Sequence, residues 1–190
     1  GAALAYGLGR LGDRVVVFDE GDMAVRASRA NFALVWVQTK GLGMPEYAVW
    51  TVGSAKVWPE LADELKRETG FDVCLQQPGG FAMALSEAEL EARAATLRRF
   101  HNQAGVARYT TEILDHAQVA RMLPGIGPEV AGASFCPLDG HVNSLRLFRA
   151  LHKAMAQQGA TYLPNAAVSA IRKNGTAFEL TAGNRTVTAG

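Results

Sequence analysis

The chain begins with Gly1–Gly12, GAALAYGLGRLG, followed by Arg14–Glu20, RVVVFDE. The first stretch is rich in small residues and predicts a helix, and the second is a short apolar run that predicts a buried strand. Asp19 closes this run 18 positions after Gly1. In a nucleotide-binding βαβ unit, a Gly-x-Gly-x-x-Gly turn leads into such a helix, and an acidic residue about 20 positions later binds a ribose hydroxyl. The opening therefore matches the second half of a dinucleotide-binding fingerprint.

Each part of this pattern has a physical reason. Small residues, among them Gly1 and Gly9, let a helix lie close to a sheet, and the amino end of the helix then offers N–H groups and a positive dipole end to a pyrophosphate. The alternative is an ordinary amphipathic helix followed by a buried strand, and the local pattern alone leaves both open. If Gly1 is the last glycine of the motif, the first strand lies upstream. We therefore expect a fragment of a longer protein, inactive by itself.

Composition restricts the class of protein. Of 190 residues, 48% are hydrophobic and 19% charged, which is typical of a soluble globular chain with a sizeable core. The 19 Lys and Arg residues nearly balance the 18 Asp and Glu residues, which argues against nucleic-acid or acidic-membrane partners. No uncharged apolar run approaches the length of a membrane span. The two cysteines, Cys74 and Cys136, are interpreted as reduced, buried thiols.

Helices and strands alternate along the chain. We expect strands over 14–18 and 160–163 that share a layered α/β domain with helices over 1–11 and 144–158. The further expected elements are a loop over 21–40, a helix from Pro45 to Gly70 with Trp50, Val57, Leu61 and Leu65 on one face, a hairpin of 73–76 with 81–85, helices capped by Ser86 and Asp115, a strand over 132–136, and three strands turned at Asn174-Gly175 and Gly183-Asn184.

These elements predict two domains in an α/β fold. Residues 1–45 and 138–190 form a Rossmann-like nucleotide-binding domain that is incomplete because its first strand is missing. Residues 46–137 form an inserted domain with an antiparallel sheet. Three of the four histidines, His101, His116 and His152, have no spacing typical of a metal site, so we expect no metal.

Four segments resemble one known family. They are RVVVFDEGD (14–22), ASRANFALVW (27–36), LPGIGPEVAGASFCPLDGHVNSLRLFRAL (123–151) and AAVSAI (166–171). They resemble the FAD-dependent oxidoreductases of the D-amino-acid oxidase type, which include glycine oxidase, sarcosine oxidase and D-amino-acid dehydrogenase. The stretch ASRANFALVWVQTKG (27–41) is most similar to the B subunits of opine oxidases and to the related subunit of hydrogen cyanide synthase. The resemblance covers the whole chain, as the N-terminal half of such a protein.

The resemblance implies a set of FAD-binding residues. Asp19 takes the place of the acid that binds the ribose, with Glu20 beside it at the adenosine, and Val168 takes the place where backbone groups pair with adenine. Ser28, Arg29 and Asn31 take the place of a loop under the pyrophosphate. Ala33 and Leu34 take the place where backbone N–H groups approach the flavin ring, and Gly1 is the last glycine of the diphosphate turn. Without the resemblance, 21–40 is interpreted as an irregular polar loop.

A turn further along also matches the family. Asp139, Gly140, His141 and Asn143 fit the pattern Asp-Gly-x-x-Asn/Asp-Pro ahead of a helix, with Ser144 where proline is usual. We interpret this turn as structural and assign no catalytic role to His141.

The resemblance further implies the chemistry. The flavin accepts a hydride at N5 from the C–H of a small amine or amino acid of the glycine, D-amino-acid or opine type. The family's substrate ligands come mainly from later in the chain, so no catalytic residue is assigned. A hetero-oligomer with other oxidase subunits and a location in the cytoplasm, or at the periphery of the inner membrane, are expected. The alternatives are an NAD(P)-dependent Rossmann oxidoreductase and a non-catalytic assembly subunit.

Overall fold

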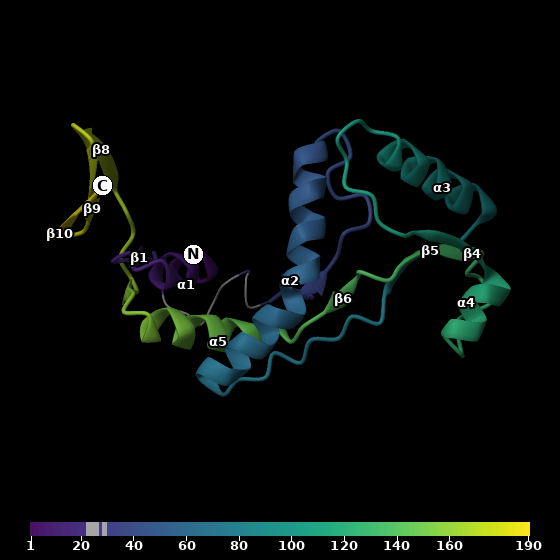
Figure 1. The fold of residues 1–190 in the computed structure, drawn as a ribbon, viewed down its shortest axis with the longest axis horizontal. Coiled ribbons are helices and arrows are strands. Elements are labelled where there is room, and N and C mark those ends of the chain that lie inside the picture. Colours follow the sequence, from purple (N-terminus) through teal and green to yellow (C-terminus); the bar gives the residue numbers. More distant parts are fainter. Residues whose placement is uncertain (22–26, 28–29) are drawn as a thin grey trace. The chain divides into compact units, whose positions relative to one another are not determined.

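The computed structural model describes residues 1–21, 27 and 30–190, drawn as a ribbon in Figure 1. Contacts divide the chain into two compact units. The first consists of Gly1–Asn31, Glu64–Val73 and Ser144–Gly190, and the second of Phe32–Asp63 and Cys74–Asn143. These units differ in their boundaries from the two domains expected from the sequence.

A parallel strand pair and two helices form one part of the first unit. Strand β1 (Val16–Phe18) pairs in parallel with β7 (Thr161–Leu163). Helix α1 (Ala2–Arg10) packs against α5 (Ser144–Gln157) (Figure 1). The α/β character predicted for this part of the chain is confirmed.

Gly9 allows the close approach of α1 to the end of α5. A Cβ atom at Gly9 would lie 2.7 Å from the Cβ of Gln158, whereas one at Gly1 or Gly7 would meet nothing within 4 Å. The small residue at position 9 therefore serves contact with a helix end rather than with the sheet that the sequence suggested.

A cluster of polar side chains joins α1 to the last part of helix α2 (Pro45–Thr69). The Tyr6 hydroxyl lies 2.8 Å from Glu64 Oε1 and 2.9 Å from Glu68 Oε2, and because it carries one proton it donates to one carboxylate at a time. Arg10 Nη1 lies 2.9 Å from Glu64 Oε1. Burial, followed by the two hydrogen bonds, raises the pKa of Tyr6. The pairing with Arg10 offsets the cost of burying the Glu64 charge.

The last three strands form an antiparallel meander. Strands β8 (Ala170–Asn174), β9 (Ala177–Ala182) and β10 (Arg185–Ala189) lie in the order β10-β9-β8. The turns contain Gly175 at φ +62° and Gly183 at φ +59°, a region that glycine adopts without steric cost. The two predicted hairpin turns are confirmed.

The second unit is built on a three-stranded antiparallel sheet. The strand order is β3 (Gly80–Ala84), β5 (Gly132–Cys136), β4 (Glu112–Asp115). Helices α3 (Glu87–His101) and α4 (His116–Met122) pack on it.

Both predicted helix caps of this unit are present. Glu89 N donates to Ser86 Oγ at 3.2 Å at the start of α3, and Gln118 N donates to Asp115 Oδ1 at 2.8 Å at the start of α4. Each cap satisfies an N–H group that has no partner within its helix.

The predicted hairpin of 73–76 with 81–85 is wrong. Strand β3 pairs with β5, and Gln76 instead exchanges backbone hydrogen bonds with His141 of strand β6 (Gly140–His141), at 2.9 and 2.8 Å. Partners distant in sequence thus replace the local pairing that the Gln-Pro-Gly-Gly turn suggested.

Helix α2 buries only part of the face predicted for it, since Leu65 is 0% exposed. Trp50 is 72% exposed and Val57 is 53% exposed, whereas Val52 and Ala55 are buried. In this half of the helix, the buried contacts are therefore made by Val52 and Ala55 and not by Trp50 and Val57.

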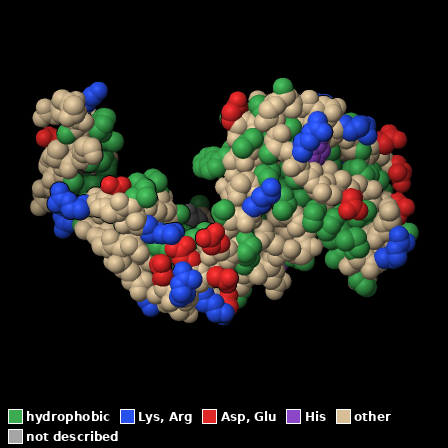
Figure 2. All heavy atoms as spheres, viewed as in Figure 1, with side chains coloured by type: hydrophobic (Ala, Val, Ile, Leu, Met, Phe, Trp, Pro, Cys, Tyr) green, Lys and Arg blue, Asp and Glu red, His purple; other side chains and the backbone are tan. Residues whose placement is uncertain are grey.

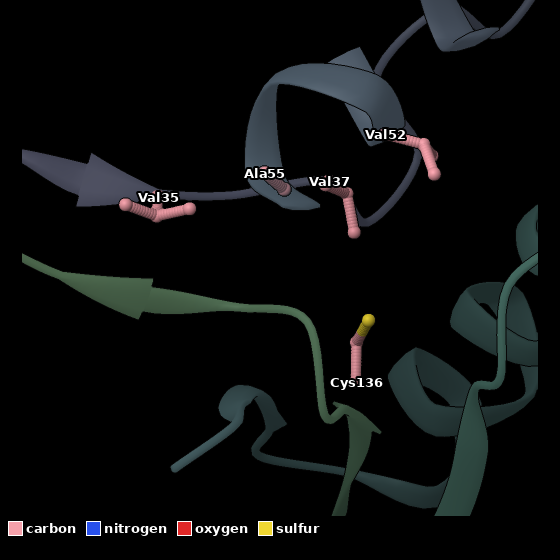
Figure 3. Close-up of a cluster of buried hydrophobic side chains, with 5 residues drawn as sticks. All are labelled: Val35, Val37, Val52, Ala55 and Cys136. Atoms are coloured by element: carbon pink, nitrogen blue, oxygen red, sulfur yellow. The ribbon is translucent and has the colours of Figure 1, made fainter. Parts of the chain in front are cut away.

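The buried face of α2 closes one hydrophobic cluster, shown in Figure 3. Its buried members come from separate segments of the second unit, and their side chains converge on one space: Val35, Val37, Val52, Ala55 and Cys136.

The two cysteines lie in different environments. Burial raises the pKa of the Cys136 thiol to about 11. Cys74 is exposed, at φ +54°, so the prediction that both thiols are buried is wrong for this residue. Its position in an irregular segment, rather than in a hairpin strand, accounts for the difference.

Charges of both signs mix on the surface. On the face drawn in Figure 2, Lys and Arg side chains lie among Asp and Glu side chains, in keeping with the net charge of +1.

His101 ends α3 in a largely aromatic environment. Its ring centroid lies 5.2 Å from that of Phe100 and 5.0 Å from that of Tyr109. Its Nε2 lies 3.2 Å from Thr111 Oγ1. Burial, followed by the charge of Arg108, lowers the pKa of His101 below its ordinary value of 6.5.

We expect this histidine to make stability fall as the medium becomes acidic. Below pH 6.5 the unfolded chain protonates His101 while the folded ring resists protonation, so the unfolded state binds more protons and the free energy of unfolding decreases. Urea unfolding between about pH 7.5 and about pH 5.5 checks this. His101→Gln should reduce the slope of stability against pH, and equal slopes in the two proteins would contradict the prediction.

Gly140 lies where β6 crosses the segment before β3. Strand β6 pairs antiparallel with β2 (Leu34–Val35), and a Cβ atom at Gly140 would overlap Gln76 O and lie 2.8 Å from Gln77 Cα. These neighbours are backbone atoms, which move less readily than the end of a side chain. Glycine is therefore required here for space.

We expect Gly140→Ala to lower the free energy of unfolding by about 1–3 kcal/mol, the usual cost of overpacking. Gly53 is the matched control, because it lies within α2 and a Cβ there would meet nothing within 4 Å. Gly53→Ala should raise stability by up to about 1 kcal/mol. Thermal or urea unfolding measures both, and an unchanged midpoint for Gly140→Ala would show the prediction wrong.

Candidate functional site

Asp19 follows the last residue of β1 and extends its pairing. Its N–H donates to Leu163 O at 3.0 Å, and its carbonyl accepts from Ala166 N at 2.7 Å. The apolar run ahead of it forms a parallel pair, so the carboxyl ends of β1 and β7 lie at one sheet edge. Ligands of open α/β sheets bind outside this edge.

Two groups orient the Asp19 carboxylate. The Tyr162 hydroxyl donates to Oδ2 at 3.1 Å, and Gly21 N donates to Oδ1 at 3.3 Å. Tyr162 reaches it because Val17 and Tyr162 are partners in the β1–β7 register. A carboxylate held in this way at a strand end is suited to accept hydrogen bonds from sugar hydroxyls.

His152 of α5 lies beside this pair. Its ring centroid is 5.2 Å from that of Tyr162 and 4.4 Å from that of Phe148. Burial lowers the pKa of His152, and the Asp19 carboxylate opposes that shift. The imidazole therefore lies within electrostatic reach of the Asp19 carboxylate.

The amino end of α1 has the properties of an anion site. Gly1 precedes its first turn, which contains no acidic side chain. N–H groups and the positive end of the helix dipole favour a negatively charged group at this position. Helix α1, whose amino end this is, packs against α5, the helix that contains His152.

The remaining implied residues of the first unit lie in irregular segments. Glu20 adjoins Asp19 in the chain and is exposed, whereas Asp19 and Gly21 are partly buried. Asn31 Nδ2 donates to Ala27 O at 3.4 Å. Val168 is 39% exposed between β7 and β8, two residues after the Ala166 N–H that binds the Asp19 carbonyl. Ser28 and Arg29 lie outside the described residues.

Ala33 and Leu34 belong to the second unit. Ala33 has φ +49°, and its carbonyl accepts from Val142 N at 3.0 Å. Leu34 begins β2, opposite His141, and is 56% exposed. A left-handed conformation at a residue with a Cβ is uncommon and is found where surrounding contacts impose it.

Tyr162 and His152 were not identified from the sequence. Both occur in predicted elements, but only the register that pairs residue 17 with residue 162 brings the phenol to Asp19. A single sequence does not reveal which residues of two distant strands lie opposite each other. The missing information was strand pairing, not residue chemistry.

The chemistry of this set fits a dinucleotide better than a metal. Asp19 supplies a ribose acceptor, the amino end of α1 supplies N–H donors to phosphate, and the segment at Val168 is apolar. Across residues 1–21, 27 and 30–190, no group of three or more His, Cys, Asp or Glu side chains is placed to hold a metal ion. Nor does any helix in that part of the chain have the length and apolar character needed to cross a membrane.

Comparison with known proteins identifies the family. The profile of the DAO family, described as FAD dependent oxidoreductase, matches residues 1–189. The opine oxidase B subunit of Agrobacterium tumefaciens (strain Ach5) is 51% identical over 171 residues, which are 90% of this chain and 46% of that protein. The opine oxidase B subunit of Rhizobium meliloti is 44% identical over 180 residues, 95% of this chain and 48% of that protein.

The fold agrees with this comparison. The crystal structure of glycine oxidase from Geobacillus kaustophilus matches with a TM-score of 0.87 at 27% identity, over 100% of this chain and 50% of that one. The chain thus spans about half the length of the curated relatives it matches. By the extent of the profile match, the chain belongs to the DAO family of FAD-dependent oxidoreductases.

Proposed function

We propose that the full-length protein is an FAD-dependent oxidoreductase that oxidises a small amine or amino acid of the opine, glycine or D-amino-acid type. The observation that carries the proposal is the Asp19 carboxylate, held at the end of β1 by Tyr162 and Gly21. The relatives named as opine oxidase B subunits and as glycine oxidase support the substrate class.

The described residues would have distinct tasks toward FAD. Asp19 would accept a hydrogen bond from the ribose, with Glu20 beside it, and Val168 would offer backbone groups to adenine. The amino end of α1 at Gly1 would face the diphosphate, together with Asn31. The same task is proposed for Ser28 and Arg29, which lie outside the described residues. Ala33 and Leu34 would present backbone to the flavin ring. FAD, when bound, supplies the acceptor for a hydride from the substrate C–H.

The wider arrangement is part of the same proposal. We assign FAD binding to residues 1–45 and 138–190 and the substrate domain to 46–137, with no catalytic side chain assigned. Because the relatives in Agrobacterium and Rhizobium are named as B subunits, a different subunit of the same oxidase is the expected partner. Cytoplasmic or peripheral inner-membrane location is the accompanying expectation, which cell fractionation tests.

Removing the charge of Asp19 should weaken FAD binding in the full-length protein. Asp19→Asn loses a charge-assisted hydrogen bond, so we expect the FAD dissociation constant to rise about ten-fold or more. Titration of apoprotein followed by flavin fluorescence measures it. Asp13→Asn, which changes an exposed acid of the same unit, is the control, and equal effects of the two substitutions would contradict the assignment.

The activity itself has a direct test. Purified full-length protein, together with its partner subunit, should show the visible absorption of bound flavin and reduce an electron-accepting dye with one of glycine, sarcosine, D-amino acids or opines. A colourless protein that binds no FAD would exclude the proposal and favour an assembly subunit. Reduction that depends on added NAD(P) would favour the alternative oxidoreductase.

A further inference from the structure

Four polar side chains of the second unit meet in its interior. We call them the buried polar cluster: Gln38, Arg93, Ser134 and Asp139. Gln38 is 1% exposed, and Ser134 and Asp139 are 0% exposed. Burial of a carboxylate raises the pKa of Asp139, and hydrogen bonds from Val37 and Gln38 and the charge of Arg93 oppose that shift. Such burial is costly unless every polar atom has a partner.

The Gln38 carboxamide uses all of its hydrogen-bonding positions within this cluster. Its Nε2 donates to Asp139 Oδ2 at 2.8 Å and to Gly80 O at 3.0 Å. Its Oε1 accepts from Arg93 Nη2 at 3.1 Å and from Ser134 Oγ at 2.6 Å. A reversed amide would place N–H groups against the guanidinium, so the network permits one orientation only. Gln38 therefore links the anion Asp139 to the cation Arg93.

The cluster also holds main-chain groups next to Gln38. The second oxygen of Asp139, Oδ1, accepts from Val37 N at 2.6 Å. The Tyr109 hydroxyl donates to Val37 O at 3.0 Å and accepts from Thr39 N at 3.0 Å. Side chains distant in sequence thus fix the backbone of residues 37–39.

The other end of the same segment is fixed by the chain that follows Asp139. Val142 N donates to Ala33 O, and Leu34 and Val35 pair with the strand β6. The turn that begins at Asp139 therefore holds residues 33–35 through its backbone and residues 37–38 through its carboxylate. Ala33 keeps its left-handed conformation, φ +49°, inside this frame.

One side of this held segment carries exposed apolar groups. Phe32 is 88% exposed and Leu34 is 56% exposed, while Val35 and Val37 are buried. A fixed backbone beside exposed apolar side chains suits a flat aromatic ring, since the apolar contact surface is then held in place.

We propose that Asp139, acting through Gln38 and Val37, is a positioning residue that sets the backbone of Ala33 and Leu34 against the flavin ring. This inference rests on the proposed FAD function and deepens it. Hydrogen-bond donors fixed before reaction stabilise charge on a ligand without the cost of reorganisation, so their geometry determines how well the bound ring carries negative charge. The cluster is therefore expected to tune the flavin and not only to stabilise the fold.

The test uses the FAD-loaded full-length protein and one variant of each of two side chains that hold residues 37–39. Asp139→Asn keeps the size of the side chain but places an N–H group where Gln38 Nε2 or Val37 N now donates. Tyr109→Phe keeps the ring and removes the hydroxyl between Val37 and Thr39. The readouts are the visible absorption bands of the flavin and its affinity for sulfite, a small anion that reacts with oxidised flavin.

Val119→Ala is the matched control. Val119 is 0% exposed in the second unit, in a separate cluster with Leu114, Ala133 and Phe135, so its truncation leaves a cavity away from residues 33–39. Unfolding midpoints of all variants show how far stability has fallen in each.

We expect Asp139→Asn to shift the flavin bands and to weaken sulfite binding by about three- to ten-fold, the loss of one hydrogen bond's free energy. Tyr109→Phe should act in the same direction to a smaller extent, and it decides the question if Asp139→Asn yields no folded protein. Val119→Ala should leave both readouts unchanged. Flavin signals equal to wild type in the two segment variants, or equally shifted in Val119→Ala, would overturn the inference. Wild-type protein without bound FAD would instead overturn the proposed function beneath it.

Discussion

The second unit depends on one ion held out of water, the carboxylate of Asp139. Its two oxygens accept from the Val37 N–H and from the Gln38 amide, at 2.6 and 2.8 Å. The Oε1 atom of Gln38 in turn accepts hydrogen bonds from Arg93 and Ser134. Replacing such a group with an apolar residue often leaves stability unchanged or higher, whereas removing one partner is costly. A buried charge of this kind is thus better understood as fixing one conformation than as a source of stability.

The predictions that held are those set by local chemistry. The caps at Ser86 and Asp115 and the glycine turns after Asn174 and Ala182 depend on residues three or fewer positions apart, and the structure contains them all. The hairpin of 73–76 with 81–85 failed because His141, far along the chain, supplies better partners for Gln76. The stripe predicted for α2 was only partly correct, because Leu65 is buried whereas Trp50 and Val57 are exposed.

The residues of the candidate site also differ in whether the sequence alone could identify them. Asp19 was found from its position after an apolar run, since that position is a property of the sequence. Tyr162 was not found, because it reaches the carboxylate only through the parallel register of β1 and β7. Asp139 was assigned to a structural turn, and its contacts with Val37 and Gln38, about 100 positions earlier in the chain, needed the folded coordinates.

The unequal environments of the two cysteines have a practical consequence. Cys136 is fully buried and its pKa is raised to about 11, whereas Cys74 is exposed. Because the thiolate is the reactive form, a maleimide dye at neutral pH should modify Cys74 in the native protein without any engineered residue. The chain passes from the first compact unit to the second between Val73 and Cys74. A probe attached there would report on the environment of one of the points at which the chain crosses between the two units.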